Sequence, residues 1–216
     1  MTSAAVFDMD GVLIDSGAHH RRAWRALLAE LGAEPADPEH WRLTIGRPSE
    51  EAIPLLLGRR VSGAEARRLA RRKRDLYQEQ AQAGLEPVAG VREFLDSLAR
   101  QDVPRAVGTS ASRWDAERLL DDLNLLHHFD VIVTADDVML GKPDPEVWTQ
   151  VARRLRIGPG HCVVFEDAVV GIEAARRAGM RIVGVTTAHT ESELLAAGAE
   201  RAIPDFQGLR WSALSR

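Results

Sequence analysis

Short apolar runs alternate with amphipathic helical segments along most of this chain, and this alternation constrains the fold more than any other feature. One run opens the chain at Ala4 to Phe7, and the others are Arg105 to Gly108, Val131 to Thr134, Cys162 to Phe165, Arg181 to Val185 and Ala202–Ile203. From Pro87 onward, apolar residues recur at helical spacing between the runs. Strands separated by helices form parallel sheets that helices cover on both faces. The sequence therefore predicts an α/β fold built on a Rossmann-like parallel sheet.

The segment between the first apolar run and residue 83 lacks a strand pattern. Helical segments are indicated after Ser16, which is placed to cap the first helix, and over Ile53 to Leu57 and Ala64 to Gln82. An all-helical insertion after the first strand is expected to form a small attachment to the sheet. We therefore expect residues 16–82 to form an α-helical cap domain, and residues 1–15 and 83–216 to form the α/β core.

Composition narrows the classes of function. The chain of 216 residues has a net charge of −4, which argues against a general nucleic-acid-binding protein. The basic stretch Arg67 to Arg74 is interpreted as the solvated face of a helix. No leader segment or apolar run of membrane-spanning length is visible, and the single cysteine, Cys162, suits a reducing compartment. We therefore expect a cytoplasmic monomer that acts on neither nucleic acid nor membrane.

Polar side chains follow the apolar runs at the points where the strands would end. In open parallel sheets the ligand site lies at the carboxyl ends of the strands, so these side chains should meet. The set comprises Asp8, Asp10, Thr109, Ser110, Glu166 and Asp167, together with Lys142 in the loop GKPDPE. We predict that they form one site.

This set of side chains suits magnesium-dependent phosphoryl transfer. Mg²⁺ takes oxygen ligands, and two or three carboxylates with a backbone carbonyl suffice to hold it. Because a carboxylate and a phosphate repel each other, the cation and Lys142 must offset the negative charge. Asp8 would attack phosphorus and become an aspartyl phosphate, while Asp10 would protonate the leaving oxygen and then deprotonate the hydrolytic water. The hydroxyl groups of Thr109 and Ser110 can donate hydrogen bonds to phosphate oxygens.

Four stretches, FDMDGVLIDS, VGTSAS, GKPDPE and VVFEDAVVGIEAARRAGM, resemble the four motifs of the haloacid dehalogenase superfamily in the right order. The segments HRRAWRALLAELG and RRKRDLYQE are similar to the β-phosphoglucomutase-like subgroup, which has a small helical cap. The resemblance implies Asp8 as nucleophile, Asp10 as general acid and base, Lys142 as the charge-balancing lysine, and Thr109 with Ser110 at the phosphate-binding hydroxyl position, Thr109 being preferred. It also implies Mg²⁺ held by Asp8, the Asp10 carbonyl and Asp167, with Glu166 bound directly or through water.

The resemblance suggests substrate contacts as well. Gly11 and Ser110 are expected at the substrate-binding site. His20 and Lys73 are candidate cap contacts that couple substrate binding to closure, and Arg47 is a candidate contact for a second anionic group. Each cap residue has a plainer alternative: His20 as a packed core histidine, Lys73 as part of a basic helix face, and Arg47 as a loop arginine in solvent.

The choice among reactions depends on two positions. Asp10 argues against a dehalogenase, because cleavage of a carbon–halogen bond needs no proton for the leaving group. Mutases of the subgroup are expected to have an arginine three positions after the cap-loop glycine, where Ser49 stands, whereas Arg47 directly follows Gly46. We therefore expect a phosphatase for a small phosphosugar or phosphoglycolate-type metabolite, with a β-phosphoglucomutase-type mutase as the alternative. A catalytically idle binding protein is the third class.

Overall fold

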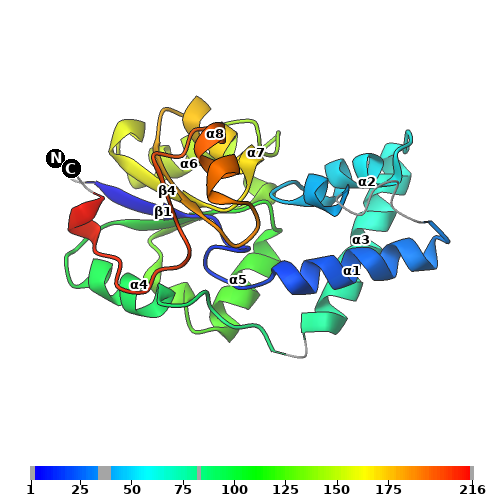
Figure 1. Ribbon diagram of the computed structural model, residues 1–216, viewed down its shortest axis with the longest axis horizontal. Helices are drawn as coiled ribbons and strands as arrows, with labels where there is room; N and C mark the ends of the chain where they lie inside the picture. Colours follow the sequence, from blue (N-terminus) through cyan, green and yellow to red (C-terminus); the bar gives the residue numbers. More distant parts are fainter. Residues whose placement is uncertain (1–2, 34–39, 82–83, 215–216) are drawn as a thin grey trace.

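A parallel β-sheet lies at the centre of the computed structural model, which describes residues 3–33, 40–81 and 84–214. Its strands are hydrogen-bonded in the order β3-β2-β1-β4-β5-β6, and every neighbouring pair is parallel. The strands are β1 (Ala4–Phe7), β2 (Arg105–Gly108), β3 (Val131–Val133), β4 (Cys162–Glu166), β5 (Arg181–Val185) and β6 (Arg201–Ile203). Because β1 pairs with both β2 and β4, the first strand of the chain lies in the middle of the sheet (Figure 1). The predicted α/β fold is confirmed.

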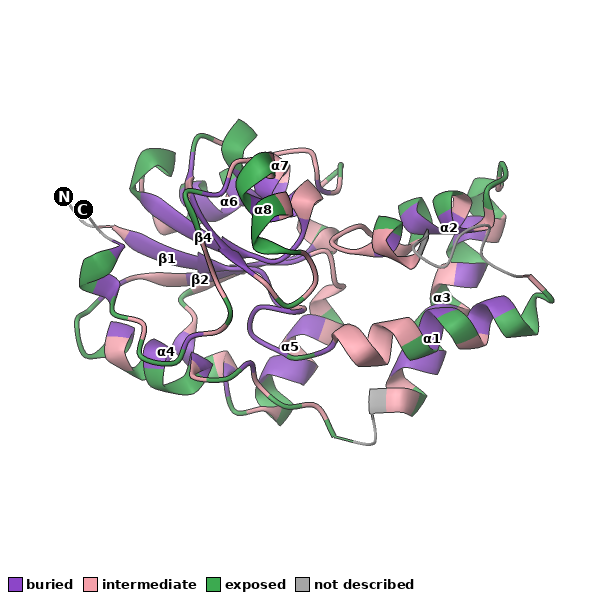
Figure 2. Cartoon of the chain, in the orientation of Figure 1, coloured by how far each residue is buried: buried purple, intermediate pink, exposed green. Residues whose placement is uncertain are grey.

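Successive strand side chains point to opposite faces of the sheet and enter two separate cores. In β1, Ala5 and Phe7 belong to one core, and Ala4 and Val6 belong to the other. The first face packs against α4 (Val91–Ala99) and α5 (Arg113–Asp122), and the second against α6 (Glu146–Leu155), α7 (Val169–Arg177) and α8 (Glu191–Ala197). The central strands are buried throughout (Figure 2). Full burial of one Val or Phe side chain contributes about 1.5–3 kcal/mol, so this layered core positions the strand ends firmly.

Three helices inserted after β1 pack on one another beside the sheet, at the right of Figure 1. They are α1 (Gly17–Glu30), α2 (Ser49–Leu57) and α3 (Gly63–Ala81), and α3 contacts both of the others. Leu27 and Leu28 of α1 share a buried apolar cluster with Leu69 and Leu76 of α3. The predicted helical insertion is therefore present, while the domain boundaries at residues 16 and 82 stay predictions.

Two predicted boundary features are wrong. The strand predicted to reach Thr134 ends at Val133, because Thr134 caps the following turn and its backbone N–H donates to Asp137 Oδ2 at 2.8 Å. Ser16 does precede α1, but its hydroxyl makes no cap hydrogen bond and donates instead to Asp10 Oδ1 at 2.6 Å. A carboxylate is a stronger acceptor than a neutral group, so Ser16 positions a candidate catalytic residue rather than the helix.

The helical boundaries in the insertion differ slightly from those expected. The helix predicted over Ala64 to Gln82 begins at Gly63 and ends at Ala81, and residue 82 lies outside the described residues. The helix predicted around Ile53 begins earlier, at Ser49. No helix in the part of the chain that the structure describes has the length and apolar character needed to cross a membrane.

Candidate functional site

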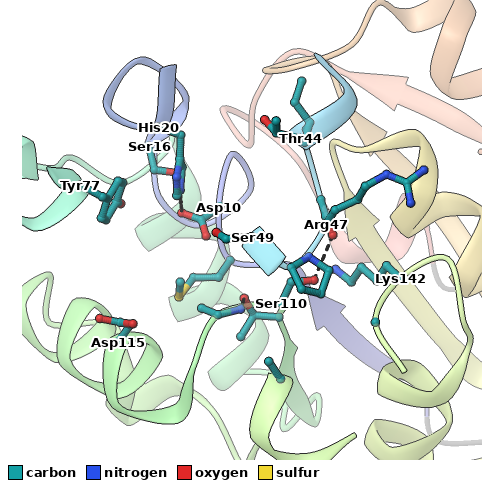
Figure 3. A pocket seen from close by; sticks show the side chains of 18 of the residues that line it. Asp10, Ser16, His20, Thr44, Arg47, Ser49, Tyr77, Ser110, Asp115 and Lys142 are labelled. Carbon is teal, nitrogen blue, oxygen red and sulfur yellow. Dashed lines mark hydrogen bonds and ion pairs between the residues drawn. The ribbon is translucent and has the colours of Figure 1, made fainter. Parts of the chain in front are cut away.

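A cavity of about 600 Å³ lies where the carboxyl ends of the strands face the inserted helices (Figure 3). The predicted site residues that line it are Asp8, Asp10, Gly11, His20, Arg47, Lys73, Thr109, Ser110, Lys142 and Asp167. Glu166 is the last residue of β4 rather than the first after it, and it is fully buried beneath the cavity. One site therefore receives residues from four separated stretches of the core and from the helical insertion.

Lys142 is the centre of the buried charge network. Its Nζ lies 2.7 Å from Asp8 Oδ1 and 2.8 Å from Glu166 Oε2, and it donates to the Gly108 carbonyl at 3.2 Å. The ammonium group also sits 4.4 Å from the centre of the Trp148 ring. Burial alone lowers the pKa of Lys142, but the two carboxylates outweigh it and the pKa is raised. This lysine is therefore permanently charged.

The three acids Asp8, Glu166 and Asp167 offer carboxylate oxygens that all lie within 4.8 Å of one another. Burial, followed by repulsion from Glu166, raises the pKa of Asp8 to about 7. The same two causes raise the pKa of Asp167. Since one lysine does not offset three carboxylates, the cluster has an excess of negative charge that a divalent cation would neutralise. The donor set, all oxygen, fits Mg²⁺.

The carboxylates of this cluster are not equivalent. Both oxygens of Glu166 have partners, Lys142 Nζ and the backbone N–H of Ala168 at 3.1 Å. Among the described residues, no hydrogen bond reaches Asp8 Oδ2 or Asp167 Oδ1. These two oxygens are therefore the available ligands, and Glu166 holds the lysine in place.

Gly11 gives Asp167 the space it occupies. A Cβ atom at position 11 would lie 1.9 Å from Asp167 Oδ2, and the residue has a φ of +76°, so only glycine fits. Thr187 Oγ1 contacts both the Gly11 carbonyl, at 2.6 Å, and Asp167 Oδ2, at 3.2 Å. His189 Nδ1 lies 2.9 Å from the Asp167 carbonyl. The sequence predictions missed Thr187 and His189, although their place just after the β5 run follows the rule that found the other residues.

Asp10 turns away from the acidic cluster toward the helical insertion. Its Oδ1 accepts from Ser16 and lies 3.0 Å from His20 Nε2, and His20 Nδ1 lies 2.7 Å from Lys73 Nζ. Because a charged lysine only donates, His20 Nδ1 accepts and Nε2 carries the proton given to Asp10. Burial would raise the pKa of Asp10, but His20 and the Ser16 hydroxyl outweigh it and lower the pKa to about 2.

The insertion residues of this chain are partly packed and partly polar. His20 stacks on Tyr77 with a ring separation of 4.3 Å, so it packs and bonds to Asp10 at once. Lys73 is only 6% exposed and contacts the Trp24 and Tyr77 rings, so the alternative of an ordinary solvated lysine is wrong. Burial lowers the pKa of Lys73 to about 8.

The two candidate hydroxyl groups have different neighbours. Thr109 is buried, and its Oγ1 accepts from the backbone N–H of Ala111 at 3.1 Å, which leaves its proton for a ligand. Ser110 Oγ donates to the Gly46 carbonyl at 3.0 Å and so links the core to the loop before α2. In Figure 3 the Arg47 side chain extends away from Asp10. The preference for Thr109 is consistent with these contacts, and the roles of all three residues stay predictions.

Comparison with known proteins agrees with this geometry. Residues 5–185 match the family described as haloacid dehalogenase-like hydrolase. A validoxylamine A 7′-phosphate phosphatase from Streptomyces hygroscopicus subsp. limoneus is 37% identical, covering 98% of this chain and 97% of that protein. The fructose-1-phosphate phosphatase YqaB of Escherichia coli (strain K12) is 36% identical over 83% of this chain and 94% of that protein.

A solved structure gives the same picture. The crystal structure of a β-phosphoglucomutase from Clostridium difficile superposes with a TM-score of 0.86 at 26% identity, covering 99% of this chain and 96% of that one. The similarity thus extends through the helical insertion as well as the sheet. The chain belongs to the haloacid dehalogenase-like hydrolase family.

Proposed function

We propose that this enzyme is a Mg²⁺-dependent phosphatase that hydrolyses a small phosphorylated metabolite through an aspartyl phosphate. The observation that carries the proposal is the buried contact of Asp8 with Lys142 beside Asp167, with Asp10 facing the same cavity. The two relatives named as phosphatases support a phosphoric monoester hydrolase whose substrate is a phosphorylated sugar or a similar polyol.

The metal would be held by Asp8 and Asp167, whose carboxylates offer oxygens within 4.8 Å of each other, and by the Asp10 carbonyl. Glu166 would act through Lys142 and through water, because both of its oxygens already have protein partners. When bound, Mg²⁺ offsets the negative charge of the phosphoryl group and of the carboxylate that attacks it. Gly11 and Thr187 keep the Asp167 carboxylate at the cavity wall.

Asp8 is the nucleophile. Its Oδ2, which has no hydrogen-bond partner among the described residues, would hold the cation, and Oδ1, beside Lys142 Nζ, forms the new bond to phosphorus while the bond from phosphorus to the ester oxygen breaks. The ester oxygen takes a proton from Asp10 and leaves as an alcohol. Water then attacks phosphorus, its proton passes to Asp10, and the bond to Asp8 breaks to release phosphate. Thr109 donates its hydroxyl proton to a phosphate oxygen, and Lys142 stabilises the charge on the transferring group.

Asp10 changes protonation state during this cycle. In the free enzyme the hydrogen bonds of Ser16 and His20 to Oδ1 stabilise the carboxylate, which is the form that takes a proton from water. A bound phosphate places negative charge beside Asp10 and raises its pKa, which favours the protonated form that the first step needs. Oδ2, on which the described residues place no hydrogen bond, carries the transferred proton.

Hydrolysis is favoured over mutase chemistry by the loop before α2. A mutase binds a bisphosphate in two orientations, and in the mutases that this chain resembles an arginine three positions after the loop glycine is expected to hold the second phosphate. Ser49 stands where that arginine is expected, and Arg47 extends away from Asp10 (Figure 3). The phosphatases of the comparison are also more similar in sequence than the mutase structure.

The test is release of inorganic phosphate from p-nitrophenyl phosphate and from a panel of sugar phosphates in the presence of excess Mg²⁺. We expect activity that EDTA abolishes and that Asp8→Asn lowers by about 10³-fold or more. Asp121→Asn, at an exposed position, is the matched control and should retain full activity. Conversion of β-glucose 1-phosphate to glucose 6-phosphate with a bisphosphate primer, without net phosphate release, would select the mutase instead.

A further inference from the structure

The two walls of the cavity have opposite charge. Residues of the helical insertion contribute six basic side chains to the lining and only two acidic ones, Glu50 and Glu51, a net formal charge of +4. The basic residues are Arg21, Arg47, Arg67, Arg71, Lys73 and Arg74. The core wall contributes six aspartates and a single lysine, Lys142. Mg²⁺ would neutralise Asp8 and Asp167 of the acidic wall, but the proposed phosphoryl transfer gives no role to the arginines of the basic wall.

Three arginines of α3 form one face of that helix. Arg67, Arg71 and Arg74 are four and three residues apart, which places them on the same side. All three are exposed, as the sequence predicted, and they also belong to the lining of the cavity. For these three arginines the interpretation as a solvated helix face is therefore confirmed, and the same face is accessible to a ligand in the cavity.

These arginines lack counter-ions. Within residues 3–33, 40–81 and 84–214, no carboxylate oxygen lies within 4.0 Å of Arg67, Arg71 or Arg74. Arg72, on another side of the same helix, instead contacts Glu30 at 2.9 Å and Glu79 at 3.4 Å. Like charges one helical turn apart repel each other, so an anion bound at this face relieves the repulsion. Arginine also binds phosphate and carboxylate in a bidentate manner.

The arginine face begins beside the reacting groups. Two hydrogen bonds link Asp10 through His20 to Lys73, and Arg74 is the next residue of α3. From Arg74 to Arg67 the helix rises about 10 Å, which is the scale of a phosphorylated pentose or hexose. A substrate whose phosphoryl group rests at Asp8 can therefore extend along α3. Arg47, whose side chain extends away from Asp10 (Figure 3), stays a separate candidate contact.

We propose that the preferred substrate has a second anionic group, a phosphate or a carboxylate, at the end remote from the transferred phosphoryl group, and that Arg67, Arg71 and Arg74 bind it. This inference rests on the proposed phosphatase function and specifies its substrate class. The arginines are binding residues only: the second anionic group stays on the product, and no bond to it is made or broken.

The experiment compares matched substrate pairs that differ in the distal anion. Glucose 6-phosphate with 6-phosphogluconate adds a carboxylate, and fructose 6-phosphate with fructose 1,6-bisphosphate adds a phosphate. We expect kcat/KM to be at least about tenfold higher for one or both of the more anionic members, through KM. The double variant Arg71→Ala/Arg74→Ala should reduce this ratio to below about threefold. Arg68→Ala, which removes one exposed arginine of the same helix outside the cavity lining, should leave the ratio unchanged.

Each outcome decides the inference. Equal kcat/KM within both pairs for the wild-type enzyme, or an unchanged preference in the Arg71→Ala/Arg74→Ala variant, overturns it. Preference for only the carboxylate or only the phosphate member supports it and identifies the anion. If the enzyme releases no phosphate from any ester, the proposed function fails, and calorimetric Kd values for the same four compounds then test the anion site alone. Equal Kd values within the pairs would overturn the site as well.

Discussion

The core and the helical insertion each bury one lysine at the cavity, and the two lysines have opposite electrostatic environments. Lys142 is 1% exposed and touches two carboxylates, so its pKa is raised despite burial. Lys73 is 6% exposed, but its ammonium group contacts a neutral imidazole and two aromatic rings, and burial lowers its pKa to about 8. Two buried lysines thus have opposite pKa shifts, because burial outweighs the attraction of Asp10 and Asp115 at Lys73, whereas the two carboxylates in contact with Lys142 outweigh burial there.

The difference reflects two ways of organising charge. In the core, strands fixed by a layered apolar interior place Lys142 in contact with Asp8 and Glu166, so most of its positive charge is offset by carboxylates before a ligand arrives. In the insertion, Arg67, Arg71 and Arg74 line the cavity without a carboxylate partner among the described residues, so their charge is available to a ligand. We propose that the core supplies the groups for phosphoryl transfer and that the insertion selects the substrates that reach them.

The comparison predicts its largest effect for Lys142→Met. This change leaves Asp8 and Glu166 buried without a cation, so we expect phosphatase activity to fall by at least about 10³-fold. The free energy of unfolding at pH 8 should fall by about 3–5 kcal/mol, as for other broken buried ion pairs. Urea unfolding at pH 8 measures this loss of unfolding free energy. At pH 6 the loss should be smaller, because a protonated carboxyl group has no charge left without a partner. A loss below about 1 kcal/mol at both pH values would contradict the proposed network.

A smaller effect is predicted for Mg²⁺ binding as a function of pH. The pKa of Asp8 is about 7 without metal, so a proton competes with the cation below that pH. We expect the Kd for Mg²⁺ to rise about tenfold from pH 8 to pH 6, measured by calorimetry. In the metal-free protein, the contribution of Asp8 to stability is fully present below its usual pKa of 3.8 and is lost as pH rises through about 7.

The control for this measurement is Asp167→Asn. It removes a candidate ligand and one negative charge beside Asp8, so Mg²⁺ binding should weaken at every pH and the Asp8 pKa should fall. A Kd that is the same at pH 6 and pH 8 in the wild-type enzyme would show that the acidic cluster is not the metal site.

The smallest effect is predicted for Lys73→Met. Because burial already disfavours the charged lysine, methionine should leave the free energy of unfolding at pH 7 equal or raise it by up to about 2 kcal/mol. Loss of a cation near Asp10 should raise the Asp10 pKa and shift the acidic limb of the rate profile to higher pH, with kcat/KM about three- to tenfold lower. Destabilisation as large as that of Lys142→Met would break the comparison between the two lysines.

Sequence patterns were most informative where local constraints determine the structure. The runs at Arg105 to Gly108 and Arg181 to Val185 form β2 and β5 at the predicted residues. The acids after β1 and at the end of β4 meet as expected, because the carboxyl ends of parallel strands share one edge. Short strands with buried neighbours on both faces leave few alternative placements for the residues that follow them.

Other features of the site depend on contacts between distant segments, and the sequence pattern does not reveal them. Ser16 looks like a helix cap, but its hydroxyl bonds to Asp10 once the loop folds back. The arginines of α3 have the composition of a solvated face, and only the packing of α3 against α1 and α2 turns them toward the cavity. Which face of a helix meets a cavity depends on how the helices pack, and charge alone does not encode that.

Gly141, the residue before the buried core lysine, meets the loop that leads into α2. A Cβ atom at position 141 would lie 2.5 Å from Pro48 Cγ, so the two segments touch only because glycine has no side chain there. Even a methyl group at position 141 would force one of the two segments to shift. How closely the core loop approaches the helical insertion at the cavity is therefore determined in part by the absence of a side chain at position 141.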